Sequence, residues 1–425
     1  MLFTSGRLPV IGVLAIAAVL ASTAHAQQRI PLTLAEAEDL ALDSEPGQVA
    51  LMARADALAE QSVVAGQLPD PTLRVGLNNY PLEAGDFSTE GMTHALVGVR
   101  QAFPAGKTRS ISTRKFESLA DEMTESAGAR GRDVLTAARQ AWLEAYYWQQ
   151  AHALVSESRP FFDDLAVVTR SLYAVGRKNQ QDVLRAELEL SRLDDRLIEI
   201  DRRRSHAQAV LGEWVGDNAR RPIALKLPGW DTVPSREVLV DGMLAHPALR
   251  AAESTIAARN AGIDLAEEKF KPGWALDLGY SYRDGYLPNG DPRSDFISLS
   301  VTVDLPFFSR KNRQDRSLAA ALSERRAAVS SREQLRRNLV SRLDAELSHW
   351  RDVDRRLDLY AAQILPQTNE QAQAALAAYQ RDSGDFADVM RGYIDDLNTR
   401  LDHIRLQVER AQSYAVLANL GGIPR

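Results

Sequence analysis

The sequence predicts a mainly α-helical fold with a small β part, built from two copies of one unit. Three observations support this fold class. Short segments recur in order at a spacing of about 200 residues, each copy holds two stretches that alternate apolar and polar residues, and the remainder reads as long helical pattern. A duplication of this length indicates two fused repeats.

The duplication is read from pairs of short motifs. Glu45-Pro46 recurs as His246-Pro247, and Phe103-Pro104 recurs as Leu305-Pro306. Because the pairs keep their order while the offset drifts only from 201 to 206 residues, chance is a poor explanation. We therefore expect a signal peptide at 1–26, a first repeat at 27–230 and a second repeat at 231–425. Further pairs are Pro160 with Pro366, Tyr173 with Tyr379, Asp182-Val183 with Asp388-Val389, Leu211 with Leu417, and Gly216 with Gly422.

The first 26 residues have the layout of a secretory signal. Arg7 supplies a positive charge, the apolar run spans Val10 to Leu20, and Ala24-His25-Ala26 fits a cleavage site. The alternative is an N-terminal membrane anchor, but the apolar run is too short to span a bilayer. We expect the mature chain to begin near Gln27.

Composition narrows the class of protein. The sequence has no cysteine, which excludes disulfides, thiol catalysis and a lipid-modified N-terminal cysteine. Its formal net charge is −6, which argues against nucleic acid as a partner. After the signal, no stretch reaches the roughly 18 apolar residues of a membrane helix. If the protein crosses a membrane, it must use strands.

Four segments alternate apolar with small or charged residues, and they run from about 72 to 80, 92 to 103, 273 to 283 and 295 to 305. This period places one set of residues on each face of a strand. The apolar set comprises Trp274, Leu276, Leu278, Ile297, Leu299 and Val301, and the polar set comprises Arg74, Asp277, Ser298, Ser300 and Asp304.

Two architectures suit such strands. In a sandwich the apolar face turns inward, whereas in a transmembrane barrel it faces lipid and the polar set lines the lumen. Strand length, aromatic residues near the strand ends and Gly-rich polar loops favour the barrel. Four strands cannot close one, since small barrels need about eight strands. Open edges in lipid would leave backbone groups unpaired, so several chains must share one barrel.

Long helical pattern fills the rest of each repeat. It runs from Thr33 to about Leu68, where Thr33 and Glu36 form a capping box, and then through hairpins at about 108–216 and 310–422. Pro160 is expected to kink the first hairpin or to start a new helix in it. Hairpins of this length must pack side by side, within and between chains.

This combination resembles the TolC-type outer-membrane efflux channels. The residues that carry the resemblance are the signal peptide, the duplicated strand pairs and the two hairpin turns. The turns read Tyr173, Gly176, Asp182, Val183 and Leu184 in the first repeat, and Tyr379, Gly384, Asp388, Val389 and Met390 in the second. The resemblance implies a homotrimer with a twelve-stranded barrel in the outer membrane of a Gram-negative bacterium, embedded in outer-membrane lipid above a periplasmic helical tunnel. It also implies a periplasmic adaptor and an inner-membrane transporter of the RND type as partners, with no cofactor.

The resemblance further implies a gate and a docking region at the hairpin tips. Asp388 matches an acidic position of the family's cation-binding ring, Arg391 departs from the acidic residue expected beside it, and Asp385 is a candidate second carboxylate. Like charges brought to one three-fold axis attract cations, although an acid at a helix N-terminus is also favoured by the helix dipole alone. The spacing from Gly384 to Asp388 predicts a shorter second turn. Adaptor or transporter contacts are expected at Gly176, Arg177, Asp182 and Gly384.

Two other classes of protein are disfavoured. Catalytic motifs are missing from the sequence and its histidines are scattered, so no enzyme, catalytic residue or resident metal site is expected. A periplasmic adaptor also carries a helical hairpin, but not two hairpins each preceded by a strand pair. For the exported substrate, the second turn resembles that of channels paired with heavy-metal cation exporters. Multidrug or other organic solutes are the alternative.

Overall fold

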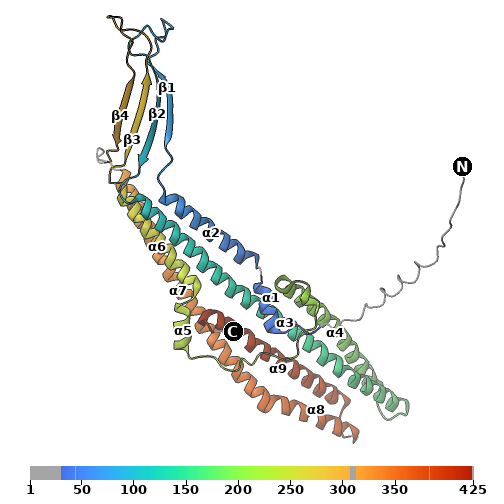
Figure 1. Ribbon diagram of the computed structural model, residues 1–425. Coiled ribbons are helices and arrows are strands. Elements are labelled where there is room, and N and C mark those ends of the chain that lie inside the picture. The colour runs from blue at the N-terminus through green and yellow to red at the C-terminus, as the bar shows by residue number, and fades with distance from the viewer. Residues whose placement is uncertain (1–29, 44, 307–312, 382, 424–425) are drawn as a thin grey trace, which may run out of the picture. The chain divides into compact units, whose positions relative to one another are not determined.

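The computed structural model describes residues 30–43, 45–306, 313–381 and 383–423, so the expected signal peptide lies outside the described residues (Figure 1). The chain forms two compact units. The first contains Met1–Leu40, Ala138–Gly229 and Leu357–Ala411, and the second contains Ala41–Ala137, Trp230–Arg356 and Gln412–Arg425. The expected mainly helical fold with a small sheet is confirmed.

Helices make up most of both units. Where one stretch was expected from Thr33 to Leu68, the structure has two helices. They separate at Glu45-Pro46 because proline disrupts the interior of a helix but is well tolerated in its first turn, where the missing N–H would have no intrahelical partner. Glu45 caps the second of them, since its Oε2 accepts the backbone N–H of Gln48 at 2.5 Å. The helical elements are α1 (Leu34–Leu42), α2 (Pro46–Gly66), α3 (Thr108–Ala174), α4 (Gln180–Val215), η1 (Gly216–Arg220), α5 (Arg236–Leu244), α6 (Pro247–Glu268), α7 (Arg313–Leu359), η2 (Tyr360–Ile364), α8 (Leu365–Gln380) and α9 (Phe386–Gly421).

The two corresponding prolines of the hairpins behave differently. Pro160 lies inside α3, which continues through it as one helix of 67 residues. Pro366 instead occupies the first turn of α8, directly after the π-helical turn η2. A new helical segment therefore starts at the proline in the second repeat and not in the first.

Four strands form one antiparallel sheet in the order β1-β2-β3-β4. The strands are β1 (Thr72–Asn78), β2 (His94–Phe103), β3 (Trp274–Tyr282) and β4 (Phe296–Val303). The central pairing of β2 with β3 joins the two repeats and runs from Ala95↔Tyr282 to Phe103↔Trp274. Figure 1 shows this sheet at one end of the helices of its own unit.

The helical core of the second unit lies below the sheet. Leu239 and Met243 of α5 and Leu343 of α7 are fully buried, and Leu417 of α9 packs in the same cluster. At 25 cal/mol per Å² of apolar surface, each such side chain stabilises the fold by about 1.5–3 kcal/mol. The short helix α5 is therefore held by apolar packing against α7 and α9.

His246 in the second repeat has the same capping role as Glu45. Its Nδ1 accepts the backbone N–H of Ala248 at 3.2 Å, and its Nε2 lies 3.2 Å from Oδ1 of Asn419. Burial lowers the pKa of His246, and this effect exceeds the opposing hydrogen bond to Asn419. The ring is therefore held neutral, with Nε2–H donating to Asn419. This tautomer leaves Nδ1 free to cap α6.

The first unit has its own apolar core between the two hairpin ends. Phe162 of α3, Ile200 of α4, and Phe386, Val389 and Met390 of α9 are buried in one cluster. Because α3 and α4 come from the first repeat and α9 from the second, this core joins the repeats within the unit.

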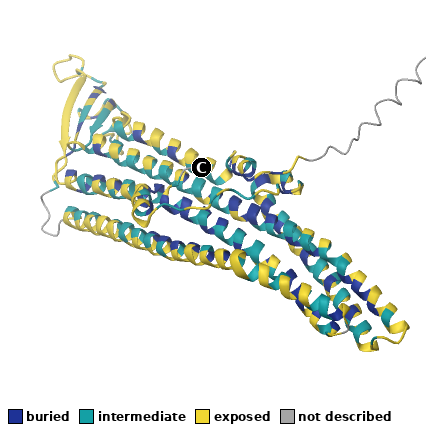
Figure 2. Ribbon diagram, turned by 90° about the horizontal axis from the view of Figure 1, so that it is seen from below, coloured by how far each residue is buried: buried dark blue, intermediate teal, exposed yellow. Residues whose placement is uncertain are grey.

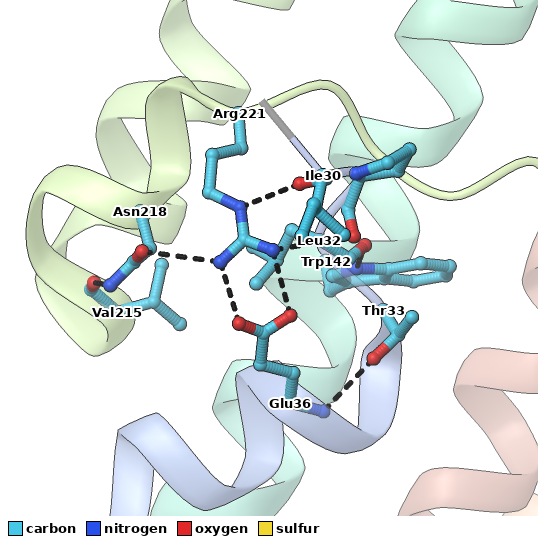
Figure 3. A network of polar contacts seen from close by, with 9 residues as sticks. Ile30, Leu32, Thr33, Glu36, Trp142, Val215, Asn218 and Arg221 are labelled. Carbon is cyan, nitrogen blue, oxygen red and sulfur yellow. Dashed lines mark hydrogen bonds and ion pairs between the residues drawn. The ribbon is translucent and has the colours of Figure 1, made fainter. Parts of the chain in front are cut away.

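Polar contacts anchor the start of the described chain to this unit (Figure 3). Leu32 forms a parallel bridge with Ile223, and its carbonyl accepts Nε1–H of Trp142 at 3.0 Å. Arg221 donates to the carbonyl of Ile30 and forks onto both carboxylate oxygens of Glu36, at 2.6 and 2.9 Å. This hydrogen bonding to Arg221 lowers the pKa of Glu36. Glu36 thus faces Arg221, and Thr33 Oγ1 still accepts the backbone N–H of Glu36.

A buried ion pair joins α1 to α3 in the same unit. Arg139 Nε donates to Glu38 Oε1 at 2.7 Å, and the two side chains are 5% and 9% exposed. Removing one partner of such a pair takes away the charge that offsets the burial of the other, which costs several kcal/mol.

We expect Arg139→Ala to lower the free energy of unfolding by about 3–5 kcal/mol, measured by chemical denaturation followed by circular dichroism. The matched control is Arg202→Ala, which removes an exposed ion pair with Glu199 and should lower the free energy of unfolding much less, because water screens exposed pairs. Equal losses in the two variants would show that burial of the Arg139 pair does not contribute as stated.

Candidate functional site

The polar residues expected on one side of the sheet do share one face. The register places Arg100, Asp277 and Ser300 in one cross-strand row, and Arg74, Gly98, Gly279 and Ser298 in the next. Asp304, just beyond β4, has the same phase as Ser298 and Ser300 and donates its backbone N–H to Gly273. The polar set of the sequence analysis therefore forms one continuous polar face.

Charge on this face is concentrated at Asp277. Its carboxylate lies 3.4 Å from Nη1 of Arg74 and 3.5 Å from Nη1 of Arg100. The Asp277 side chain is 14% exposed, whereas those of Arg74 and Arg100 are 58% and 33% exposed. Two guanidinium groups thus share one carboxylate, which leaves the cluster with a net positive charge.

The opposite face carries the apolar set, and it is open to solvent in the described chain. Ile297, Leu299 and Val301 of β4 are 79%, 69% and 59% exposed. Along β3 the pattern is reversed relative to a soluble sandwich, because Ala275 and Ser281 of the polar face are buried while Leu278 is 54% exposed. Figure 2 shows exposed residues along the strands of this sheet. The sandwich alternative requires a cover for the apolar face, and the described residues do not provide one.

The two outer strands leave backbone groups unpaired within the described chain. β1 pairs with β2 only, and β4 pairs with β3 only. All eight residues of β4 are exposed. Long exposed edges of this kind are templates for pairing with another chain.

Aromatic residues lie at both ends of the apolar face. Phe103 and Trp274 stack at the end nearer the helices, with ring centroids 4.0 Å apart. At the other end Tyr282 stacks on Phe87 of the β1–β2 loop, and Tyr280 lies on the same face of β3.

The loops at that end are held together by arginine. Arg293 of the β3–β4 loop donates to the carbonyls of Ser88 and Glu90 in the β1–β2 loop, at 2.9 and 3.1 Å. Within the β1–β2 loop, hydrogen bonds from Ser88 and Thr89 lower the pKa of Asp86 to about 2. The Arg293 hydrogen bonds thus fix the two loops to each other, and the Asp86 hydrogen bonds order the β1–β2 loop itself.

The tip of the first hairpin is a turn that needs glycine. Gly176 has a φ of +72°, a left-handed conformation that side chains disfavour. Its backbone N–H donates to Tyr173, and that of the exposed Arg177 donates to Leu172. Asp182 lies in the first turn of α4, with Asn179 as the N-cap. The three candidate contact residues Gly176, Arg177 and Asp182 therefore lie together at one tip.

The tip of the second hairpin corrects one expectation. Its connection, from Gln380 to Phe386, has the same length as the connection from Ala174 to Gln180, so the second turn is not shorter. The glycine has moved within the turn instead. A Cβ on Gly384 would lie 2.9 Å from that of Ala378, so glycine is needed here for close approach and not for a left-handed φ.

The candidate gate residues lie at the start of α9. The backbone N–H of Asp388 donates to the carbonyl of Asp385, so Asp388 occupies the acidic first turn of a helix. Asp388 Oδ1 also accepts from Arg391 Nη1 at 3.1 Å, and the two side chains are 60% and 68% exposed. An exposed pair of this kind contributes about 0–1 kcal/mol. Arg391, where an acidic residue was expected, is thus the ion-pair partner of Asp388.

Two features of the tips were missed by sequence reasoning. Lys178 of the first turn lies over the ring of Tyr379 at the end of α8, 4.4 Å from its centroid. Beside them is a hollow of about 420 Å³, lined by Phe161, Leu165 and Leu376 among others.

On the sheet, the sequence pattern did not identify Arg100 as a residue of the polar face. The alternation of β2 is weak, since apolar Leu96 shares the polar face with Arg100.

Two further kinds of site concern the described residues, namely metal centres and membrane-spanning helices. They contain no group of three or more histidine and carboxylate side chains placed to hold a metal ion. Among the helices described, none is long and apolar enough to cross a bilayer.

Comparison with known proteins finds similarity to outer membrane efflux proteins. Residues 241–422 match the model of the outer membrane efflux protein family. Protein CyaE of Bordetella pertussis is 28% identical over 421 residues, which cover 93% of this chain and 85% of that protein.

Two solved structures share the fold. A membrane protein from Pseudomonas aeruginosa has a TM-score of 0.78 at 17% identity, covering 91% of this chain and 92% of the other. The outer membrane protein VceC from Vibrio cholerae has a TM-score of 0.75 at 17% identity, covering 92% and 96%. The resemblance predicted from the sequence is confirmed.

Proposed function

We propose that this chain, whose similarity to outer-membrane efflux channels has been shown, forms the outer-membrane duct of a tripartite efflux system. The observation that carries the proposal is the sheet, with its exposed apolar face, its polar opposite face and its two unpaired edges. Lipid would cover the apolar face, and solute would pass along the polar one. The similarity is to channels and not to enzymes, so the protein acts by conducting solute.

The unpaired edges set the assembly. In lipid each unpaired backbone group costs several kcal/mol, so β4 of one chain must pair with β1 of another. Three chains of four strands give a twelve-stranded barrel, wide enough to hold a lumen. The long helical hairpins would then form the periplasmic tunnel, with an adaptor and an RND-type transporter at the hairpin tips.

Oligomer mass tests this assembly. In mild detergent the mature protein should have the mass of a trimer, measured by light scattering with correction for bound detergent. A monomeric mass under these conditions would contradict the shared barrel, because each chain would then keep both edges unpaired.

Adjacent residues of β4 test which face meets lipid. Leu299→Arg should reduce insertion into the outer membrane, since arginine on the lipid face costs about 2–4 kcal/mol near the bilayer midplane. Ser300→Arg is the matched control, because Ser300 is the next residue along the strand and lies on the polar face. The measurement is the folded fraction in membranes. If Ser300→Arg is the more damaging change, the assignment of the two faces is reversed.

The gate is proposed at Asp385, Asp388 and Arg391. In a three-fold assembly the copies of Asp388 would approach one axis and attract cations, while Arg391 would moderate that charge. Support comes from the position of Asp388 at the start of α9 and from its match to the family pattern. Gly176, Arg177, Asp182 and Gly384 are proposed as contacts for the adaptor or transporter.

Channel recording tests the gate. Asp388→Ala should raise single-channel conductance or remove block by multivalent cations in planar bilayers. Asp395→Ala is the control, since Asp395 is an exposed acid farther along α9. Block that is unchanged in Asp388→Ala, or equally reduced in both variants, would reject the gate assignment.

The proposal extends to the class of exported substrate. The sequence of the second turn favours heavy-metal cations, and organic solutes are the alternative. Sensitivity of a deletion strain separates the two classes. Hypersensitivity to metal salts alone would support the first, and hypersensitivity to organic compounds alone would support the second.

A further inference from the structure

A large cavity lies where the polar face of the sheet meets the helices of its own unit. It has a volume of about 1150 Å³, larger than most pockets that enclose one small ligand. Arg100, Ala275, Thr302 and Asp304 line it from the polar face. A cavity of this size suits the passage of a solute better than its tight binding.

Basic side chains outnumber acidic ones in the lining of the cavity. Arg100, Lys269, Lys271 and Arg313 border the cavity, against the carboxylate of Asp304. Two more carboxylates lie next to it. Asp277 contacts Arg100 and Arg74, and Glu268 contacts Lys271 at 2.6 Å. Among these described residues, five basic groups face three acidic ones, so the region is electropositive.

Lys269 contributes an uncompensated charge. Within the described part of the chain its Nζ donates to the hydroxyl of Ser317 at 3.4 Å, and a hydroxyl does not neutralise an ammonium group. Glu268 is already used twice, since it accepts from Lys271 and from the backbone N–H of Lys107 at 2.8 Å. The carboxylate nearest in sequence to Lys269 therefore serves other partners.

Two helix ends add to this positive charge. Thr108 begins α3 and Arg313 begins α7, and both residues line the cavity. The N-terminus of a helix carries about half a positive charge from its aligned peptide dipoles. The backbone thus reinforces the side chains.

The duplication shows that the two lysines are particular to the second repeat. Lys269 and Lys271 occupy the positions that correspond to Leu68 and Asp70 in the first repeat, where the preceding helix ends and the strand begins. The same connection therefore carries no basic residue at these positions in one copy and two in the other.

We propose that this cavity is an anion-selecting site that attracts the carboxylate, phosphate or sulfonate group of an exported solute. The site rests on the proposed function for its position in a lumen, but it is formed within one chain. The sheet residues with polar side chains that line it, Arg100 and Thr302, lie on the polar face, opposite Leu299 and Val301, although Phe103 and Trp274 of the apolar face also border it. The charged part of the site thus faces the lumen, so the ligand is a solute there and not a lipid headgroup. Three copies around the lumen would favour an anionic organic solute over a metal cation, which bears on the substrate class.

The lack of cysteine in the sequence allows a direct test. Thr302→Cys places one thiol in the cavity, and Ser298→Cys places one on the same face about 13 Å farther along β4. Each purified protein reacts with an anionic sulfonatoethyl and a cationic trimethylammonium-ethyl methanethiosulfonate. The ratio of the two rates reports the local potential, because any effect on the thiol pKa applies equally to both reagents.

We expect the anionic-to-cationic ratio to be roughly threefold or more higher at position 302 than at position 298. In the Thr302→Cys background, Lys269→Gln with Lys271→Gln should lower the ratio to that of position 298, whereas Lys269→Arg with Lys271→Arg should keep it. Raising the ionic strength to about 1 M should also abolish the preference, since the Debye length falls to about 3 Å, and this arm needs no lysine variant to fold.

Two outcomes would overturn the proposal. One is a ratio at position 302 that equals that at 298 and does not respond to salt. The other is suppression of the anionic reagent by phosphatidylglycerol in vesicles but not by phosphatidylcholine, which would assign the site to lipid. Failure of the proposed function gives a different result, namely a monomeric mass, and the ratio can still be measured in the monomer because one chain forms the cavity.

Discussion

Backbone hydrogen bonding at the open edges of the sheet is the constraint on which the rest of the molecule depends. Within the described chain, β1 and β4 each have one unpaired side, and the apolar side chains of the sheet have no cover. Under the proposed function, another chain would pair with these edges and lipid would cover the apolar face. The same assembly would cover the exposed surfaces of the hairpin helices with neighbouring copies.

The sheet could be predicted from sequence because the signal is local. Ile297, Leu299 and Val301 alternate with Ser298, Ser300 and Thr302, so period two is visible without knowledge of the fold. Asp277 was placed on the polar face for the same reason. Its partner Arg100 was not, because Leu96 and Ala102 obscure the phase of β2.

Contacts between distant segments could not be predicted in this way. Nothing in the neighbourhood of Arg139 shows that it pairs with Glu38, about one hundred residues earlier. The second tip gives a subtler case. The position of Gly384 suggested a shorter turn, but the helix ends show turns of equal length and a glycine that serves a different purpose.

The repeats have kept their geometry while changing their chemistry. Glu45 and His246 both cap a helix that begins with proline. Hydrogen bonding to Arg130 lowers the pKa of Glu45 and keeps it charged, whereas burial keeps His246 neutral. One capping task is thus done by an anion in one copy and by a neutral ring in the other.

The π-helical turn η2 has a consequence for helical phase. Between Phe103 and Pro160 the first repeat uses four residues fewer than the second uses between Leu305 and Pro366. In an unbroken α-helix each extra residue would rotate everything after it by about 100°. A π turn holds one more residue than an α turn, so η2 changes the phase of the helix before the proline and not after it. Tyr173 and Tyr379 each follow the proline of their repeat by 13 residues of continuous helix, so the two tyrosines share one rotational setting relative to that proline.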